Sequence, residues 1–151
     1  MFSQTTEYAL RATVILAGTP ERPLTTAEIA AATKVPAGYL SKVLQSLVKT
    51  GLVNAVRGLK GGYHLSRPAE EISVLDVVNA VEPLGRIHQC PLGLPEHTHL
   101  CPLHQQIDDA IATIEQQLAS KSLAEMIDPT RANLPLCMNA PTSTLPPGAT
   151  E

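Results

Sequence analysis

The feature that most constrains this chain is a change of hydrophobic period at Gly51. The apolar residues before it recur at helical spacing: Leu40, Val43, Leu44, Leu47 and Val48. This spacing predicts an amphipathic helix over residues 37–50. After Gly51, residues 52–56 and 63–65 read as two short strands around the run Arg57-Gly58-Leu59-Lys60-Gly61-Gly62. The sequence therefore predicts a helix followed directly by a hairpin with a basic, glycine-rich tip.

Two helices are expected before this unit. Residues 4–18 carry a broad apolar stripe that ends at a glycine, which predicts a core helix. Thr25 and Glu28 have the spacing of a capping box, so a short helix should begin there and run to about Thr33. Pro36 then marks a tight connection. Two helices, a short turn and a hairpin follow one another in the order of a winged helix-turn-helix.

The second half is expected to form a helical arm. Ser73 caps a helix that runs to about Glu82, residues 85–100 look irregular, and a long amphipathic helix should cover residues 102–120. Its apolar residues form a narrow seam: Leu103, Ile107, Ala110, Ile111, Ile114 and Leu118. A partner helix can bury such a seam, and packing within its own domain is the alternative. A short segment, residues 123–127, adds one more turn.

These elements predict a mainly α fold with a small β-hairpin wing and a long C-terminal dimerisation helix. The expected organisation is a DNA-binding domain over residues 1–83, a sensing loop over 84–101, a dimerisation region over 102–127 and a disordered, proline-rich tail over 128–151.

Charge is distributed unevenly along the chain. Residues 1–67 hold eight basic and three acidic residues, a net +5, whereas residues 68–151 come to −8. A basic N-terminal half suits phosphate contacts. No segment reaches the roughly 18 apolar residues that a membrane span needs, so we expect a cytoplasmic protein with no membrane partner. Motifs for a phosphate loop, a nucleophile elbow or a zinc protease are absent, which argues against an enzyme.

The helix over residues 37–50 should present its polar side to double-stranded DNA. Ser, Lys and Gln side chains hydrogen-bond base edges or phosphates in the major groove, and the basic wing suits the minor groove or the phosphates. The residues expected to contact DNA are Gly38, Tyr39, Ser41, Lys42, Gln45, Arg57 and Lys60. A solvated helix face, or a winged helix that binds protein instead of DNA, is the alternative.

The segments Gly38-Tyr39-Leu40-Ser41-Lys42-Val43-Leu44, Gly51-Leu52-Val53 and Arg57-Gly58-Leu59-Lys60-Gly61-Gly62-Tyr63 resemble the Rrf family of winged-helix regulators, the IscR- and NsrR-like proteins. The resemblance runs over about residues 1–127. It implies a homodimer that crosses its long helices and places each recognition helix in a major groove of a near-palindromic operator, usually as a repressor. It also implies that Gly38, Ser41 and Lys42 read bases and that Arg57 enters the minor groove.

The resemblance further implies an iron–sulfur cluster in the loop, where many members use three cysteines. This chain has two there, Cys90 and Cys101, and His104 follows Cys101 by one helical turn. The leading hypothesis is a [2Fe–2S] cluster on these three residues. Its fourth ligand is open between Glu96, His97, His99 and the partner's Glu7.

Three alternatives to the cluster stay open. The first is a thiol switch, in which Cys90 and Cys101 form a disulfide under oxidant. The second is a zinc or haem site in place of the cluster. The third is a loop without a cofactor, in which the cysteines are inert. No role is assigned to Cys137, and His64 and His88 are not expected to be ligands.

Overall fold

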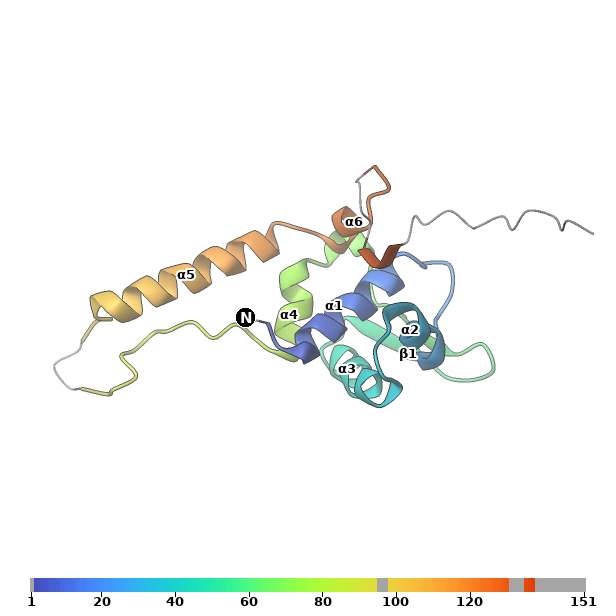
Figure 1. The fold of residues 1–151 in the computed structure, drawn as a ribbon, viewed down its shortest axis with the longest axis horizontal. Helices are drawn as coiled ribbons and strands as arrows, with labels where there is room; N and C mark the ends of the chain where they lie inside the picture. Colours follow the sequence, from blue (N-terminus) through green and yellow to red (C-terminus); the bar gives the residue numbers. More distant parts are fainter. Residues whose placement is uncertain (1, 95–97, 131–134, 138–151) are drawn as a thin grey trace, which may run out of the picture.

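Four helices and a two-stranded hairpin form the body of the molecule, from which a long helix projects (Figure 1). The computed structural model describes residues 2–94, 98–130 and 135–137. The elements of the body are α1 (Gln4–Ala17), α2 (Thr26–Thr33), α3 (Ala37–Lys49), β1 (Val53–Val56), β2 (Gly62–Leu65), the 3-10 turn η1 (Ala69–Glu71) and α4 (Val74–Val81). After them come α5 (Pro102–Ala119), α6 (Leu123–Met126) and the 3-10 turn η2 (Pro135–Cys137). The expected mainly α fold with a hairpin and a long C-terminal helix is confirmed.

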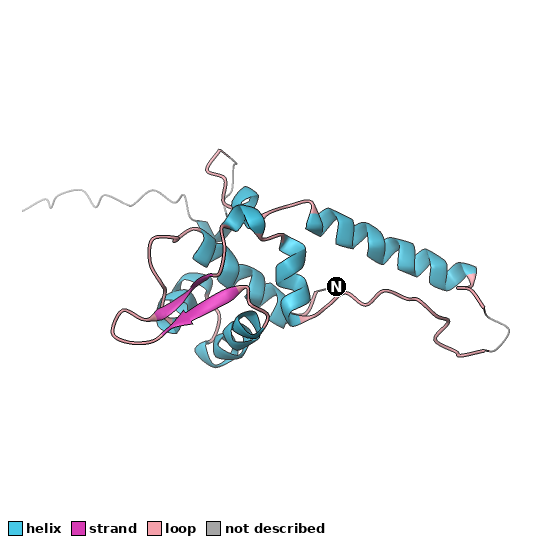
Figure 2. Ribbon diagram, turned by 180° about the vertical axis from the view of Figure 1, so that it is seen from behind, coloured by secondary structure: helices cyan, strands magenta, loops and turns pink. Residues whose placement is uncertain are grey.

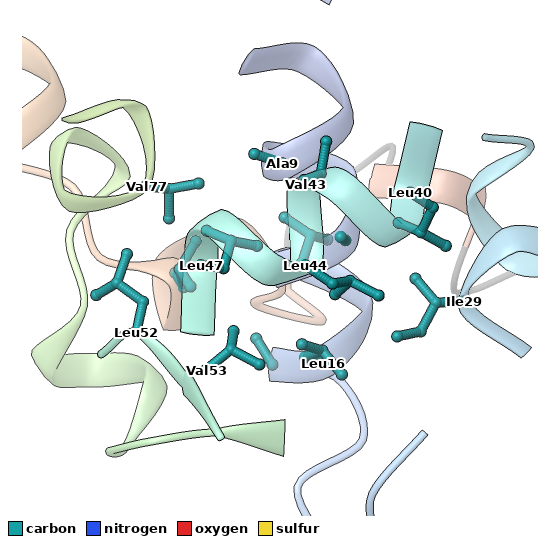
Figure 3. Close-up of a cluster of buried hydrophobic side chains, with 14 of the residues drawn as sticks. Ala9, Leu16, Ile29, Leu40, Val43, Leu44, Leu47, Leu52, Val53 and Val77 are labelled. Carbon is teal, nitrogen blue, oxygen red and sulfur yellow. The ribbon is translucent and has the colours of Figure 1, made fainter. Parts of the chain in front are cut away.

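The core forms where α1, α2 and α3 meet. Leu40, Leu44 and Leu47 lie on one side of α3 and are fully buried. They lie among Leu16 of α1 and Ile29 of α2, as Figure 3 shows. The helix-spaced leucines of α3 therefore fix which side of this helix faces the core and which side faces outward.

Local capping signals set where α2 begins. The backbone N–H of Glu28 donates to Thr25 Oγ1 at 3.3 Å, and Glu28 Oε2 accepts from the backbone N–H of Thr25 at 2.8 Å. This reciprocal pair is the expected capping box. At the other end of α2, Lys34 adopts a left-handed conformation with φ 60°, which turns the chain toward α3.

The hairpin is anchored to the body through Leu24. Strands β1 and β2 pair antiparallel, with Val53 opposite Leu65 and Val56 opposite Gly62. Leu24 adds two backbone hydrogen bonds to Tyr63, of 2.9 and 2.8 Å. A Cβ on Gly62 would lie 2.5 Å from the Leu24 carbonyl oxygen, so this close approach requires glycine.

The loop after α4 and the helix α5 form an arm that leaves the body and returns to it (Figure 2). At its base, Val74 N–H donates to Lys121 O and Leu123 N–H donates to Ile72 O, both at 2.8 Å. These bonds tie the end of α5 to the start of α4. Within the described residues, no helix is both long and apolar enough to cross a membrane.

Part of the C-terminal tail packs on the body. The turn η2 lies against α1, and Leu136 contacts the buried cluster. This differs from the disorder expected for the whole tail. Disorder was expected from the proline content, which carries no information about whether one apolar side chain packs on a hydrophobic surface. Most of the tail lies outside the described residues.

Candidate functional site

The outer side of α3 is a polar stripe. Gly38, Lys42, Gln45 and Lys49 follow one another at intervals of four, three and four residues and are all exposed. At 100° per residue these positions share one line along the helix, opposite the buried leucines. The body therefore holds α3 rigidly while its polar side remains open to a partner.

Two further expected contact residues lie beside this stripe. Tyr39 is 61% exposed, and its ring meets the ring of Tyr8 edge to face, with centroids 6.3 Å apart. This contact packs the ring of Tyr39, which lies in the first turn of α3, against α1. Ser41 is half-buried, and its hydroxyl donates to Ala37 O at 3.0 Å. Ser41 thus lies on the flank of the stripe, and its hydroxyl proton is engaged within the helix.

The hairpin tip supplies the remaining candidates. Arg57 and Lys60 are both exposed on the connection between β1 and β2. Among the described residues, no acidic side chain forms an ion pair with the cations of the stripe or the tip. Their charges are therefore available to an anionic partner.

One nearby cation is not available in this way. Arg22 donates to Glu28 Oε1 at 2.7 Å, at the edge of the hollow between α2 and the hairpin tip. The guanidinium of Arg22, together with the hydrogen bonds from Thr25, lowers the pKa of Glu28 to about 2. Arg22 is thus engaged in holding the α2 cap.

The end of the loop over residues 84–101 and the first turn of α5 bring one pair of candidate ligands together. Cys101 is the N-cap residue of α5, and its Sγ lies 3.2 Å from Nδ1 of His104, one helical turn further on. A thiolate and an imidazole this close on one helix can bind the same metal ion. Cys90 is buried in the loop before α5.

The other expected ligands are not gathered around this pair. Within the described residues, no group of three or more His, Cys, Asp or Glu side chains is arranged to hold a metal ion. Glu7 accepts from Arg11 Nε at 2.9 Å on the exposed side of α1, and His99 is exposed. Glu96 and His97 lie outside the described residues. The described residues therefore supply a two-residue chelate, with Cys90 as a further soft donor in the same loop.

An ion pair that sequence reasoning missed fastens the loop to α5. Arg86 donates to both carboxylate oxygens of Asp108, at 2.7 and 2.6 Å, and the backbone N–H of Ile87 adds a third bond of 2.8 Å. Asp108 is buried, and these donors, Arg86 first, lower its pKa to about 2. Glu115 lies on the same flank and meets Arg86 at 3.4 Å. The pair holds the start of the loop one turn from His104.

The loop residue Arg86 lies on the Asp108 side of α5, and the start of the apolar seam of α5 is exposed. Leu103 is 66% exposed and Ile107 is 42% exposed. Ile111, Ile114 and Leu118 are partly exposed along the same side. Within the described residues, the seam that the sequence predicted is therefore open at Leu103 and Ile107 and partly covered toward the end of α5.

Comparison with known proteins identifies similar structures over most of the chain. A family model described as Rrf2, iron-dependent transcriptional regulator, matches residues 2–129. T. potens IscR is similar with a TM-score of 0.70 at 28% identity, covering 83% of this chain and 85% of that one. Staphylococcus aureus CymR gives 0.67 at 26% identity, covering 86% and 100%.

A third structure supports the fold alone because its identity is lower. CymR (YrzC), described as the global cysteine regulator of B. subtilis, has a TM-score of 0.69 at 23% identity and covers 83% of this chain and 94% of that one.

Proposed function

Because this chain belongs to the Rrf2 family of DNA-binding transcriptional regulators, which are not enzymes, we propose that it acts as a homodimeric repressor of near-palindromic operators. Its DNA affinity changes with the chemical state of the loop at residues 84–101. The observation that carries the proposal is the polar stripe of α3, which is exposed on a helix whose opposite side is the core.

In this proposal α3 is the recognition helix. Lys42 and Gln45 lie on its open side, and both residue types hydrogen-bond base edges or phosphates. Gly38 has no side chain, and an added Cβ would meet nothing within 4 Å in the free protein. The first turn of α3 can therefore come close to the groove. Arg57 then reaches the adjoining minor groove from the wing.

The second copy of the chain covers the seam of α5. An apolar row that stays exposed on a projecting helix is the kind of surface that a partner helix buries. The arrangement of the loop supports this, because Arg86 and Asp108 hold it on the neighbouring flank and keep it off the seam. Crossing two such helices also brings two recognition helices to the two halves of a near-palindromic site.

The loop is proposed to hold a [2Fe–2S] cluster. Cys101, His104 and Cys90 would hold it, supported by the 3.2 Å approach of the first two. The fourth ligand would be Glu96, His97 or His99 of the same chain, or the partner's Glu7. Cysteine and histidine are the residues that ligate such clusters, and a bound cluster supplies one-electron redox chemistry. The pair Arg86–Asp108 orients the loop that carries Cys90.

Selection from a random duplex pool tests the DNA-binding proposal. The full chain, purified without oxygen, should enrich a near-palindromic sequence, and its affinity should fall steeply as salt increases. Lys42→Ala should weaken binding to that sequence. Lys121→Ala is the matched control, because Lys121 is exposed but pairs with Glu125 away from α3. Absence of any enriched sequence would refute the proposed operator recognition.

Absorption spectra of the same protein test the sensor, together with iron, sulfide and zinc analysis. Visible bands with matched iron and sulfide support the cluster. Zinc without iron, or a metal-free protein that anaerobic reconstitution cannot load, would refute it. Operator binding by such a protein would leave the DNA-binding part of the proposal intact.

A further inference from the structure

A leucine occupies the apex of the wing, with its side chain fully in solvent. The backbone N–H of Gly61 donates to the carbonyl of Gly58 at 2.9 Å, which closes a four-residue turn. Leu59 and Lys60 are the two central residues of this turn. Leu59 has a relative exposure of 109%, which exceeds that of the other exposed large hydrophobic residues of the described chain.

The turn holds Leu59 in this position. A Cβ on Gly61 would lie 2.3 Å from the Val56 carbonyl oxygen, so the two ends of the tip are in close backbone contact. Behind them, Leu24 fastens β2 to the body through Tyr63. The tip projects away from the helices, as Figures 1 and 2 both show. A rigid protrusion cannot fold back to cover its own apex.

The surroundings of Leu59 indicate the class of partner that covers it. Arg57 and Lys60 flank it, and the hairpin sequence between Leu52 and Ser66 contains no acidic residue. Glu28, which lines the hollow beside Leu59, is paired with Arg22. A single exposed leucine needs no explanation by itself. At the apex of a cationic protrusion, however, its natural partner combines negative charge with apolar strips. The minor groove of DNA does so, with phosphates along its edges and sugars and base edges inside.

We propose that Leu59 enters the minor groove beside Arg57 as an apolar wedge and packs against a base step, while Lys60 neutralises a flanking phosphate. The proposal rests on the DNA-binding function above and deepens it. Leucine is among the side chains that proteins use to open base steps. Pyrimidine–purine steps open most easily, so the wing would favour such a step at a position that no polar side chain reads.

The wedge and the charges predict different responses to salt. Leu59→Gln removes apolar contact and no charge. It should lower operator affinity about fivefold per wing, the effect of half-burying a leucine, with the salt slope unchanged. Lys60→Gln should instead reduce that slope by about 0.9 per wing. Leu59→Met keeps an apolar side chain of similar volume and should bind like the wild type.

The experiment measures the operator affinity of the full chain and these three variants at several salt concentrations. Each duplex is tested with a TA and with a GC step under the wing, and thermal unfolding checks the fold. The expected result is a preference for TA that Leu59→Gln loses and Leu59→Met keeps. If Leu59→Gln binds both duplexes as the wild type does, the wedge is refuted while DNA binding stands. If the wild type binds no duplex, the DNA-binding function itself fails.

Discussion

Replacing Gly38 by alanine should move stability and DNA affinity in opposite directions. Gly38 lies in the first turn of α3, and a Cβ built there meets nothing within 4 Å. Alanine is favoured over glycine in helices by up to about 1 kcal/mol. For a chain of this size that corresponds to a rise in Tm of roughly 2–4 °C. The free protein should therefore become more stable.

The same methyl group should weaken operator binding. If α3 enters the major groove with its first turn closest to the DNA, the new Cβ occupies space that the free protein leaves open. Loss of close contact in both recognition helices should lower affinity at least about tenfold, equivalent to about 1.4 kcal/mol. Thermal unfolding by circular dichroism measures the first effect, and titration of the selected operator measures the second.

Thr113→Ala is the control for helix propensity. Thr113 is exposed on α5, far along the chain from α3, and alanine should raise Tm there without changing operator affinity. An increase in Tm for Gly38→Ala with unchanged or tighter DNA binding would refute the placement of Gly38 at the closest approach.

Three further predictions concern the arm. Ile107→Glu should give monomers in sedimentation and weaken operator binding, because it places a charge in the seam. Gln106 is also exposed but lies outside the seam, so the control Gln106→Glu should stay dimeric. Asp108 has a folded pKa of about 2 against an ordinary 3.8, so its stabilisation is complete above pH 3.8 and is lost as pH falls through about 2. Asp108→Asn should remove this part of the acid dependence of Tm and Asp109→Asn should not; equal acid profiles would contradict the pairing. Cys101→Ser and His104→Ala should each lower the iron and sulfide content after anaerobic reconstitution, whereas Cys137→Ser should not. Full loading of the Cys101→Ser and His104→Ala variants would exclude Cys101 and His104 as ligands.

The helices and the hairpin could be predicted from sequence because their signals are local. A capping box such as Thr25 with Glu28 lies within four residues, and the leucines of α3 repeat within two turns. The exposed stripe of α3 follows from the same repeat. Ser41 shows the limit of this reasoning, because its polar side chain marked it for the DNA side while it lies on the flank and bonds Ala37 O.

Contacts between distant residues could not be predicted in this way. Arg86 sits in an irregular loop with no period, and the burial of Asp108 depends on a partner 22 residues away. A single aspartate on the polar side of an amphipathic helix looks like any solvated residue until its partner is placed. The anchoring of β2 by Leu24 could not be predicted either, because two backbone segments pair there and no side chain signals the contact.

The loop over residues 84–101 begins between two hydrogen-bonded points, and this constrains how a movement of the loop can spread. On the side of the body, Thr6 Oγ1 of α1 donates to Glu82 Oε2 at 2.8 Å, directly after α4. On the side of the arm, Arg86 grips Asp108 of α5. Only residues 83–85 separate the two points, so the backbone from Glu82 to Arg86 can span at most about 14 Å. A shift of α5 beyond that reach would break one of these contacts or carry the N-terminal turn of α1 with it.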